Sequence, residues 1–284
     1  MAARSAGIRS AIVLSAGLGT RMRPITDTIP KPLVPVGGRP LIAYALDALD
    51  RLGIDTVVVN VHYLADRLEA WLRAEGRKVT ISDERARLLD SGGGIVKALP
   101  ALGSDPFIVL NADTFWLEDP DAGEDNLETL AAAWDRTHMD VLMLTARLDQ
   151  ATGHTGRGDF TVDQDGRLAR YRGAGDPVIY SGALVIDPAI FGEGRPEVFS
   201  LNACFDEAIA RGRLFGLPMR GPRRSARPRR RWQPTGPASG CRRGDHARRS
   251  PAKGLDHPAG GELPRFARRR PPCRPLRLRA AVPG

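Results

Sequence analysis

The stretch Leu14–Pro24, LSAGLGTRMRP, decides how the first half of the chain is interpreted. It ends a short apolar run, residues 8–15, which is typical of a buried parallel strand that stops at Gly17. A strand that runs into a glycine-rich turn lets backbone N–H groups approach a phosphate chain closely. The stretch is neither a dinucleotide fingerprint, because Met22 stands where the third glycine should be, nor a Walker A loop, because no Gly-Lys-Ser/Thr follows. It therefore predicts a phosphate-binding turn of another kind.

Charged residues accompany this turn. Arg21 lies inside it, and Lys31 follows within the string Pro30-Lys31-Pro32-Leu33. Two cations beside a phosphate-binding backbone suit a nucleoside triphosphate and a second phosphate. Farther along, an apolar run ends at Asn111-Ala112-Asp113, and open α/β sheets bind ligands at the carboxyl ends of their strands. Asp113 is therefore a third candidate functional residue.

Strand-like and helix-like segments alternate over residues 1–220. Three βα units in succession predict a parallel sheet with helices on both faces. The turn Asp163-Gln164-Asp165-Gly166 between two strand-like runs predicts a hairpin. Helices are expected at residues 40–52, 65–74, 94–99, 127–136 and 199–210, and strands at 8–15, 56–61, 78–81, 107–110, 141–145, 160–162, 168–171 and 214–217. Residues 178–180 and then 183–186 are expected to form one further strand.

The charge of the chain is divided between two regions. Residues 221–284 contain 17 Arg and one Lys against three acidic residues, whereas residues 1–220 contain 24 basic and 30 acidic residues. The first region is therefore not interpreted as a basic nucleic-acid-binding domain. The last 64 residues contain eleven prolines and two aromatic residues, which indicates a basic tail without a core, either disordered or the product of a shifted reading frame.

Composition also excludes several classes of protein. The three cysteines lie far apart and form no CxxC pair, so we expect neither a disulfide scaffold nor a zinc site of the usual spacing. No run of roughly 18 apolar residues occurs, so no membrane span is expected. A cytoplasmic location follows as the default expectation.

Taken together, the motifs resemble those of the sugar-1-phosphate nucleotidylyltransferases. Within that family the chain is most similar to the bacterial N-acetylmuramate-1-phosphate uridylyltransferases of cell-wall recycling. The resemblance covers residues 8–219 and implies a Rossmann-like three-layer α/β/α nucleotidyltransferase fold with a mixed, mostly parallel central sheet. It rests on LSAGLGTRMRP, PKPLVPVGGRPLI (residues 30–42), VNVHYLAD (59–66), SDE and LLDSGGGI (within 82–95), NAD (111–113), GDF (158–160) and FSLN (199–202).

The resemblance also implies roles for individual residues. Arg21 stabilises the triphosphate and the leaving pyrophosphate, Lys31 contacts the reacting phosphates, and Asp113 binds Mg²⁺. Three glycines after Ser91 are interpreted as room for a flat base against the backbone. The implied nucleotide-binding residues are Ala16, Gly17, Gly19, Thr20, Arg21, Ser91, Gly92 and Gly93. The implied sugar-binding residues are Asn111, Asp159, Ser181, Gly182 and Asn202.

The implied reaction is an in-line attack of a sugar 1-phosphate on the α-phosphorus of a nucleoside triphosphate, most simply UTP and N-acetylmuramate 1-phosphate. The expected cofactor is Mg²⁺, and the expected assembly is a monomer or a homodimer without a specific nucleic-acid partner. Mannose-1-phosphate guanylyltransferases share the same signature and remain an alternative. Two further alternatives are a noncatalytic nucleotide-sugar-binding relative and a nucleic-acid binder that acts through the tail.

The resemblance ends between Met219 and Gly221. In many family members the next segment contains Gly-Thr-Pro and supplies a second metal-binding acid. Residues 221–284 do not restore it, so we expect the activity of this chain to be reduced.

Overall fold

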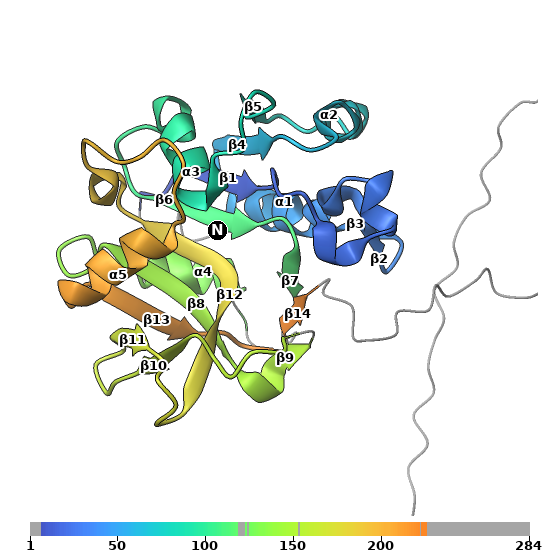
Figure 1. Ribbon diagram of the computed structural model, residues 1–284. Coiled ribbons are helices and arrows are strands. Elements are labelled where there is room, and N and C mark those ends of the chain that lie inside the picture. The colour runs from blue at the N-terminus through green and yellow to red at the C-terminus, as the bar shows by residue number, and fades with distance from the viewer. Residues whose placement is uncertain (1–6, 119–122, 124, 153, 222, 226–284) are drawn as a thin grey trace, which may run out of the picture. The chain divides into compact units, whose positions relative to one another are not determined.

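A mixed sheet of nine strands organises the computed structural model, which describes residues 7–118, 123, 125–152, 154–221 and 223–225 (Figure 1). The strand order is β11-β10-β12-β6-β1-β4-β5, and β8 and β13 continue from the other side of β12. The strands are β1 (Ser10–Leu14), β4 (Thr56–Val61), β5 (Thr80–Asp83), β6 (Phe107–Asn111), β8 (Val141–Arg147), β10 (Phe160–Val162), β11 (Leu168–Arg170), β12 (Pro177–Ile186) and β13 (Leu214–Pro218).

The parallel half of this sheet consists of β5, β4, β1 and β6, as the three successive βα units predict. Strand β12 pairs antiparallel with β6, and β8 pairs antiparallel with β12, so the sheet is mixed. The predicted hairpin is confirmed, because β10 and β11 pair antiparallel around the turn at 163–166. The carboxyl ends of β1 and β6 are neighbours, and this edge positions the site described below.

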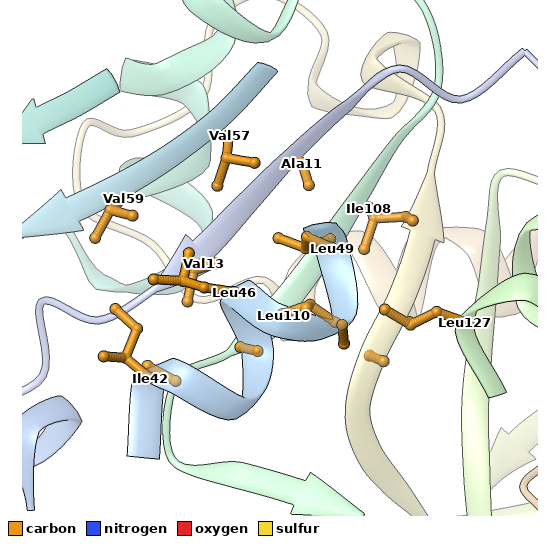
Figure 2. Close-up of a cluster of buried hydrophobic side chains, with 14 of the residues drawn as sticks. Ala11, Val13, Ile42, Leu46, Leu49, Val57, Val59, Ile108, Leu110 and Leu127 are labelled. Carbon is orange, nitrogen blue, oxygen red and sulfur yellow. The ribbon is translucent and has the colours of Figure 1, made fainter. Parts of the chain in front are cut away.

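Helices cover both faces of the sheet. Alternate residues of β1 show the division: Ala11 and Val13 pack with the α1 side, whereas Ile12 packs with the α3 side. The predicted three-layer α/β/α arrangement is therefore confirmed. Figure 2 shows α1 lying over β1, β4 and β6 in the first of these layers. The helices are α1 (Leu41–Leu52), α2 (Ala65–Ala74) and α4 (Asn126–Ala132) on one face, and α3 (Asp90–Leu102) and α5 (Asn202–Ala210) on the other.

Helix α1 follows its sequence signals at both ends. Pro40 precedes the first turn, and Gly53 ends the helix with φ of 77°, a left-handed conformation that glycine adopts without a steric penalty. The apolar side chains Leu46 and Leu49 are buried against the sheet. Burial of each leucine contributes roughly 2 kcal/mol. None of the described helices is long and apolar enough to cross a membrane.

Three predicted helices differ from the structure at their ends. Helix α3 spans Asp90–Leu102 and is longer at both ends than the helix predicted at 94–99. The helix predicted at 127–136 spans Asn126–Ala132, and beyond its end Arg213 binds the backbone carbonyls of Arg136 and Thr137. The helix predicted at 199–210 begins only at Asn202, because the carbonyl of Phe199 accepts hydrogen bonds from α3. Strand β12 confirms the one strand predicted from residues 178–180 and 183–186, and it runs without a break through Ser181 and Gly182. Its pairing shifts register near Gly182, whose φ is 88°.

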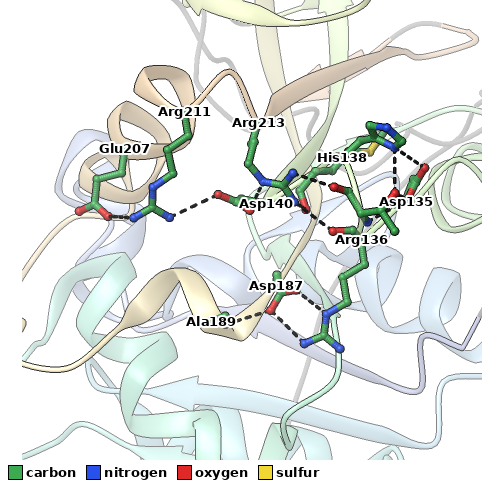
Figure 3. A network of polar contacts seen from close by, with 11 residues as sticks. Asp135, Arg136, His138, Asp140, Asp187, Ala189, Glu207, Arg211 and Arg213 are labelled. Carbon is green, nitrogen blue, oxygen red and sulfur yellow. Dashed lines mark hydrogen bonds and ion pairs between the residues drawn. The ribbon is translucent and has the colours of Figure 1, made fainter.

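A cluster of arginine–carboxylate pairs fixes the end of the sheet farthest from the carboxyl ends of β1 and β6 (Figure 3). The Arg213 guanidinium donates to Asp140 Oδ1 at 2.6 Å and to the carbonyls of Arg136 and Thr137 at 3.0 and 2.8 Å. Arg136 in turn pairs with Asp187, which follows β12. These bonds join the segment after α4 to the ends of β12 and β13, so this region stabilises the sheet.

Short elements complete the fold. The predicted basic tail begins at residue 221, and its residues 223–225 form the short strand β14, which pairs with β7 and β9. Apart from these residues and Gly221, the predicted tail lies outside the described residues. The short strands are β2 (Pro35–Val36), β3 (Arg39–Pro40), β7 (Thr114–Trp116), β9 (Ala151–Thr152) and β14 (Arg223–Ser225). The 3₁₀ helices are η1 (Thr20–Met22), η2 (Ile25–Asp27), η3 (Lys31–Leu33), η4 (Leu148–Gln150) and η5 (Pro188–Phe191).

Candidate functional site

A cleft of about 540 Å³ lies at the carboxyl ends of β1, β4 and β6. This is the edge where an open α/β sheet binds its ligands. The cleft brings together candidate residues from the glycine-rich turn, η3, the start of α3 and the end of β6. Its lining includes Ser15, Ala16, Gly17, Lys31, Asn60, Asp90, Ser91, Asn111 and Asp113.

The two glycines of the turn have different roles. Gly19 has φ of 65°, and a Cβ on it would lie 3.0 Å from Thr26 Cγ2 and 3.1 Å from Lys31 Cβ. Its carbonyl accepts hydrogen bonds from Thr26 Oγ1 at 2.8 Å and from the N–H of Met22 at 2.9 Å. A Cβ on Gly17, in contrast, would meet no atom within 4 Å. Gly19 is therefore needed to form the turn, whereas Gly17 keeps space open in the cleft.

The next residues of the turn point to solvent. Thr20 and Arg21 lie in η1 and are exposed, and neither lines the cleft. Within the described residues no carboxylate forms an ion pair with Arg21. Its guanidinium is therefore available to an anion at the edge of the turn, and its contact with a nucleotide stays a prediction.

Lys31 and Asp113 form an ion pair across the cleft, although 82 positions separate them in the sequence. Lys31 is held by the short helix η3, and Asp113 lies in the turn between β6 and β7. Their side chains remain 21% and 30% exposed, so both are accessible from the cleft. The Thr114 hydroxyl donates to Asp113 Oδ1 at 3.2 Å. The structure thus brings together two of the three residues predicted to be catalytic.

The donor set around Asp113 fits a magnesium ion that substrate phosphates help to bind. Mg²⁺ usually binds through one or two carboxylates and completes its shell with phosphate oxygens and water. Within the described part of the chain, no group of three or more His, Cys, Asp or Glu side chains forms a metal site by itself. Asp113 therefore suits a cation that arrives with a polyphosphate, and does not belong to a metal cage made by the protein alone.

The start of α3 corrects one interpretation from the sequence. Gly92, Gly93 and Gly94 are buried within the helix, and the N–H groups of Gly92 and Gly93 donate to the carbonyl of Phe199 at 2.9 and 3.2 Å. A Cβ on Gly92 would overlap the Phe199 ring, and one on Gly93 would overlap the carbonyl oxygen of Glu197. The protein itself fills the space that was interpreted as room for a base.

The residues just before these glycines do face the cleft. Asp90 has φ of 61°, which is uncommon for a residue with a side chain and marks local backbone strain. Its Oδ1 accepts from the Ser91 N–H at 2.6 Å. The Ser91 hydroxyl accepts from the N–H of Leu201 at 3.0 Å, which ties α3 to the segment before α5. Asp90 and Ser91 form this wall of the cleft.

Asn60 and Glu84 are functional candidates that sequence reasoning missed. Asn60 lines the cleft, and Glu84 is fully buried behind it, with its Oε1 accepting from Asn60 Nδ2 at 2.7 Å. The sequence contained one signal. Glu84 directly follows the strand that ends at Asp83 and lies in the SDE string, much as Asp113 lies two residues after the strand that ends at Asn111. Its partners lie on other segments and could not be inferred from the sequence.

The residues predicted to bind the sugar do not form one cluster. Asn111 ends β6 and lines the cleft, whereas Gly182 lies so close to Thr114 that a Cβ added to it would be 2.9 Å from Thr114 Cβ. The Ser181 side chain is fully buried, and its hydroxyl faces Met219 Sδ at 3.5 Å. The structure therefore brings Asn111 to the cleft and leaves the Ser181 hydroxyl outside it.

The two other predicted sugar-binding residues are held by protein groups. The Asp159 carboxylate accepts from the Tyr180 N–H at 3.0 Å. The Asn202 side chain accepts from Arg170 at 3.0 Å and contacts Ser200, at an exposed position on α5. Their contact with a sugar stays a prediction.

A smaller pocket of about 240 Å³ adjoins the cleft at Asn111 and lies between α1 and β7. Tyr44 stacks on Phe115 there, with ring centroids 4.4 Å apart. Burial raises the pKa of the Glu118 carboxyl in this pocket, although hydrogen bonds from Trp116 and Asn126 act in the opposite direction. The pocket extends from Asn111, at the end of β6, to Gly182 on the neighbouring strand β12.

Comparisons with known proteins show which family the sequence matches. The profile of the MobA-like NTP transferase domain matches residues 11–193. An N-acetylmuramate alpha-1-phosphate uridylyltransferase of Caulobacter vibrioides is 43% identical over 218 residues, which cover 74% of this chain and 88% of the relative. A protein of the same name from Neisseria meningitidis is 34% identical over 184 residues, covering 64% and 76%.

Solved structures resemble the fold. The inositol-1-phosphate CTP transferase of T. maritima superposes with a TM-score of 0.60 and covers 77% of this chain and 89% of its own. Its sequence identity is 20%, so this similarity concerns the arrangement of the helices and strands.

Proposed function

Because the chain belongs to the family of MobA-like NTP transferase domains and is a nucleotidyltransferase, we propose that it joins UTP to N-acetylmuramate 1-phosphate. The products are UDP-N-acetylmuramate and pyrophosphate. The observation that carries this proposal is the Lys31–Asp113 pair beside the open space at Gly17. The names of the two uridylyltransferase relatives support the choice of base and sugar.

The chemistry requires positioning more than proton transfer. A phosphate monoester has a second pKa of about 6, so the attacking sugar phosphate is already mostly a dianion at neutral pH. The main difficulty is to bring two polyanions together in line. Lys31 lies where it neutralises part of this charge, and Arg21 lies at the edge of the turn, where it can bind a phosphate of the nucleotide.

Asp113 is proposed to hold Mg²⁺, which supplies positive charge to the phosphate oxygens when it is bound. Lys31 and Asp113 neutralise each other in the cleft. When the nucleotide and Mg²⁺ bind, the triphosphate becomes an anionic partner for Lys31, and Mg²⁺ replaces the lysine as the positive partner of Asp113. The backbone at Gly17 keeps the cleft wide enough for phosphate oxygens to approach.

The wider setting is part of the same proposal. We assign the reaction to the recycling of cell-wall sugars in the cytoplasm, by a monomer or a homodimer. We assign residues 1–220 to the nucleotidyltransferase domain and the basic tail to a shifted reading frame. Reading the encoding DNA in its other frames should then reveal a Gly-Thr-Pro segment with a second metal-binding residue.

The test is a pyrophosphate-release assay with Mg²⁺ that crosses UTP, GTP and dTTP with several sugar 1-phosphates. The fastest turnover is expected for UTP with N-acetylmuramate 1-phosphate, and chelation of Mg²⁺ should abolish it. Asp113→Asn prepared in parallel controls for contaminating enzymes. Turnover at least about tenfold faster with GTP and mannose 1-phosphate, a difference of about 1.4 kcal/mol, would assign the chain to the guanylyltransferase alternative.

A further inference from the structure

One buried carboxyl group connects two walls of the cleft. Glu84 follows β5, and its side chain is fully buried. Its Oε1 accepts a hydrogen bond from Asn60 Nδ2 at 2.7 Å, and its Oε2 accepts one from the N–H of Leu89 at 3.0 Å. Asn60 belongs to β4, and Leu89 is the residue that precedes α3. The two oxygens of Glu84 therefore hold two separate segments.

The Asn60 side extends to the glycine-rich turn. Asn60 Oδ1 accepts from the Ser15 N–H at 2.6 Å, and the Ser15 hydroxyl donates to the Asn60 carbonyl. Ser15 is followed directly by Ala16 and Gly17, which line the cleft. The orientation of the Asn60 amide is unambiguous, because its oxygen faces a backbone donor and its nitrogen faces an acceptor.

The Leu89 side extends to the strained start of α3. Asp90 has φ of 61°, and a left-handed conformation costs a residue with a side chain about 1–2 kcal/mol. The bond from Glu84 holds the preceding residue in place, so it helps to maintain this conformation. Asp90 and Ser91 line the same cleft as Ala16 and Gly17, from a different segment of the chain.

Gly94 provides the space that the carboxyl group occupies. A Cβ at this position would lie 2.6 Å from Glu84 Oε1 and 2.9 Å from Asn60 Nδ2. A buried carboxyl group loses its hydration, and within the described residues no basic side chain forms an ion pair with Glu84. A well-packed apolar side chain often gives equal or greater stability than such a group. Stability alone therefore does not account for Glu84.

We propose that Glu84 is a positioning residue for the nucleotide. By bonding Asn60 and Leu89 together, it fixes the glycine-rich turn relative to the start of α3, and so sets the width of the cleft between them. This inference rests on the proposed function of the cleft as the nucleotide site. Glu84 itself does not line the cleft and acts only through Asn60 and Leu89.

The test exchanges the amide and the carboxyl group. In Glu84→Gln, one donor of the new amide faces either Asn60 Nδ2 or the Leu89 N–H, so one hydrogen bond becomes a contact between donors. In Asn60→Asp, two carboxyl groups face each other. The double variant combines Asn60→Asp with Glu84→Gln. Its carboxylate at position 60 can accept from the Ser15 N–H and from the amide nitrogen at position 84. The amide oxygen at position 84 accepts from the Leu89 N–H. Only the double variant restores all three hydrogen bonds: from the Ser15 N–H to residue 60, between residues 60 and 84, and from the Leu89 N–H to residue 84.

Each single variant is expected to raise the KM for UTP about tenfold, with a smaller change in kcat, because a small displacement of a binding wall weakens nucleotide binding. The double variant should return to within about threefold of the wild-type KM. Calorimetry with UTP alone should show the same pattern in Kd. All measurements are made well below the melting temperature of each variant, and Glu75→Gln, which removes an exposed carboxyl group at the end of α2, is the control.

Unchanged KM and Kd in the single variants, with only a lower melting temperature, would show that Glu84 is merely structural and overturn the inference. Single variants that lose binding without recovery in the double variant would also overturn it. A wild-type chain that binds UTP but does not turn it over contradicts the proposed reaction, and the Kd values then decide on Glu84. A wild-type chain that does not bind UTP overturns both.

Discussion

Two glycine-containing segments border the cleft, and Gly17 in the first serves the opposite purpose to Gly92 and Gly93 in the second. A side chain at Gly17 would meet no atom within 4 Å. Side chains at Gly92 and Gly93 would overlap Phe199 and the backbone of Glu197. The first segment leaves its space to the cleft, whereas the second gives its space to the packing of the protein. Glycine content alone does not distinguish these roles, because the neighbouring atoms decide which one applies.

The comparison separates two kinds of effect. Residues that face the open side of the cleft should change catalysis with little effect on folding. Residues in the filled segment should change the free energy of unfolding first. Substitutions on the two sides therefore give different ratios of lost activity to lost stability, and these ratios test the comparison directly.

The largest effect is expected from Asp113→Asn, on the open side. The variant keeps the shape of the side chain but removes the negative charge that pairs with Lys31 and that is proposed to bind Mg²⁺. Loss of such an interaction commonly lowers kcat about 10²-fold or more, roughly 2.7 kcal/mol, when it acts on the transition state. Pyrophosphate release at saturating Mg²⁺ measures this change.

The melting temperature of Asp113→Asn should stay close to the wild-type value, because the side chain is partly exposed. Asp66→Asn, at a carboxyl group whose side chain is 94% exposed, is the matched control and should retain full activity. Near wild-type turnover by Asp113→Asn would contradict the assigned role of this residue in the cleft.

The next effect is expected from Gly93→Ala, on the filled side. The new methyl group would overlap the carbonyl oxygen of Glu197, a backbone atom that cannot rotate away as a side chain does. Overpacking of this kind commonly costs about 2 kcal/mol. Urea unfolding measures the free energy, and the m-value should not change. An alanine variant as stable as the wild type would show that this segment has more room than the structure indicates.

The sequence predicted the open side of the cleft better than the filled side. The places of Lys31 and Asp113 in the cleft follow from a motif and from a strand end, both of which are local patterns, and their roles stay predictions. The packing of Gly92 against Phe199 joins residues far apart in the sequence, and no local pattern encodes it. Sequence reasoning therefore assigned the wrong physical purpose to glycines that it had located correctly.

The same limit applies to the fold. The parallel strands were predictable because they are short, nearly continuous apolar runs, and α1 was predictable because its apolar residues repeat with a helical period between Pro40 and Gly53. The strands β7, β9 and β14 contain two or three residues each, too few to show a period. Likewise, the Ser15–Asn60–Glu84 bonds link three segments, so only the folded chain reveals them.

A smaller effect is expected from Gly19→Ala, which tests the turn itself. Its φ of 65° costs an alanine about 1 kcal/mol or slightly more, and the methyl group would press on Thr26 and Lys31. Both stability and activity should fall, because the strain is local and Lys31 moves with it. Unchanged stability, measured by urea unfolding, would show that the turn adapts and that Gly19 is not required for its shape.

The smallest effect on stability is expected from Gly17→Ala, and it tests the comparison most sharply. Gly17 does not have a positive φ, and the added methyl group meets no protein atom within 4 Å, so the free energy of unfolding should stay within about 0.5 kcal/mol of the wild-type value. The methyl group would instead occupy the cleft. If phosphate oxygens approach the backbone here, losing one such hydrogen bond costs about 1 kcal/mol and raises the KM for UTP about fivefold.

The two measurements on Gly17→Ala are informative only together. Loss of stability without a change in KM would place Gly17 among the packed glycines and remove the difference from Gly93. A KM equal to that of the wild type, at unchanged stability, would show that the nucleotide does not approach this backbone, and the open space at Gly17 would need another explanation. A raised KM at unchanged stability is the one result that Gly93→Ala cannot give, since its methyl group meets the protein before any ligand arrives.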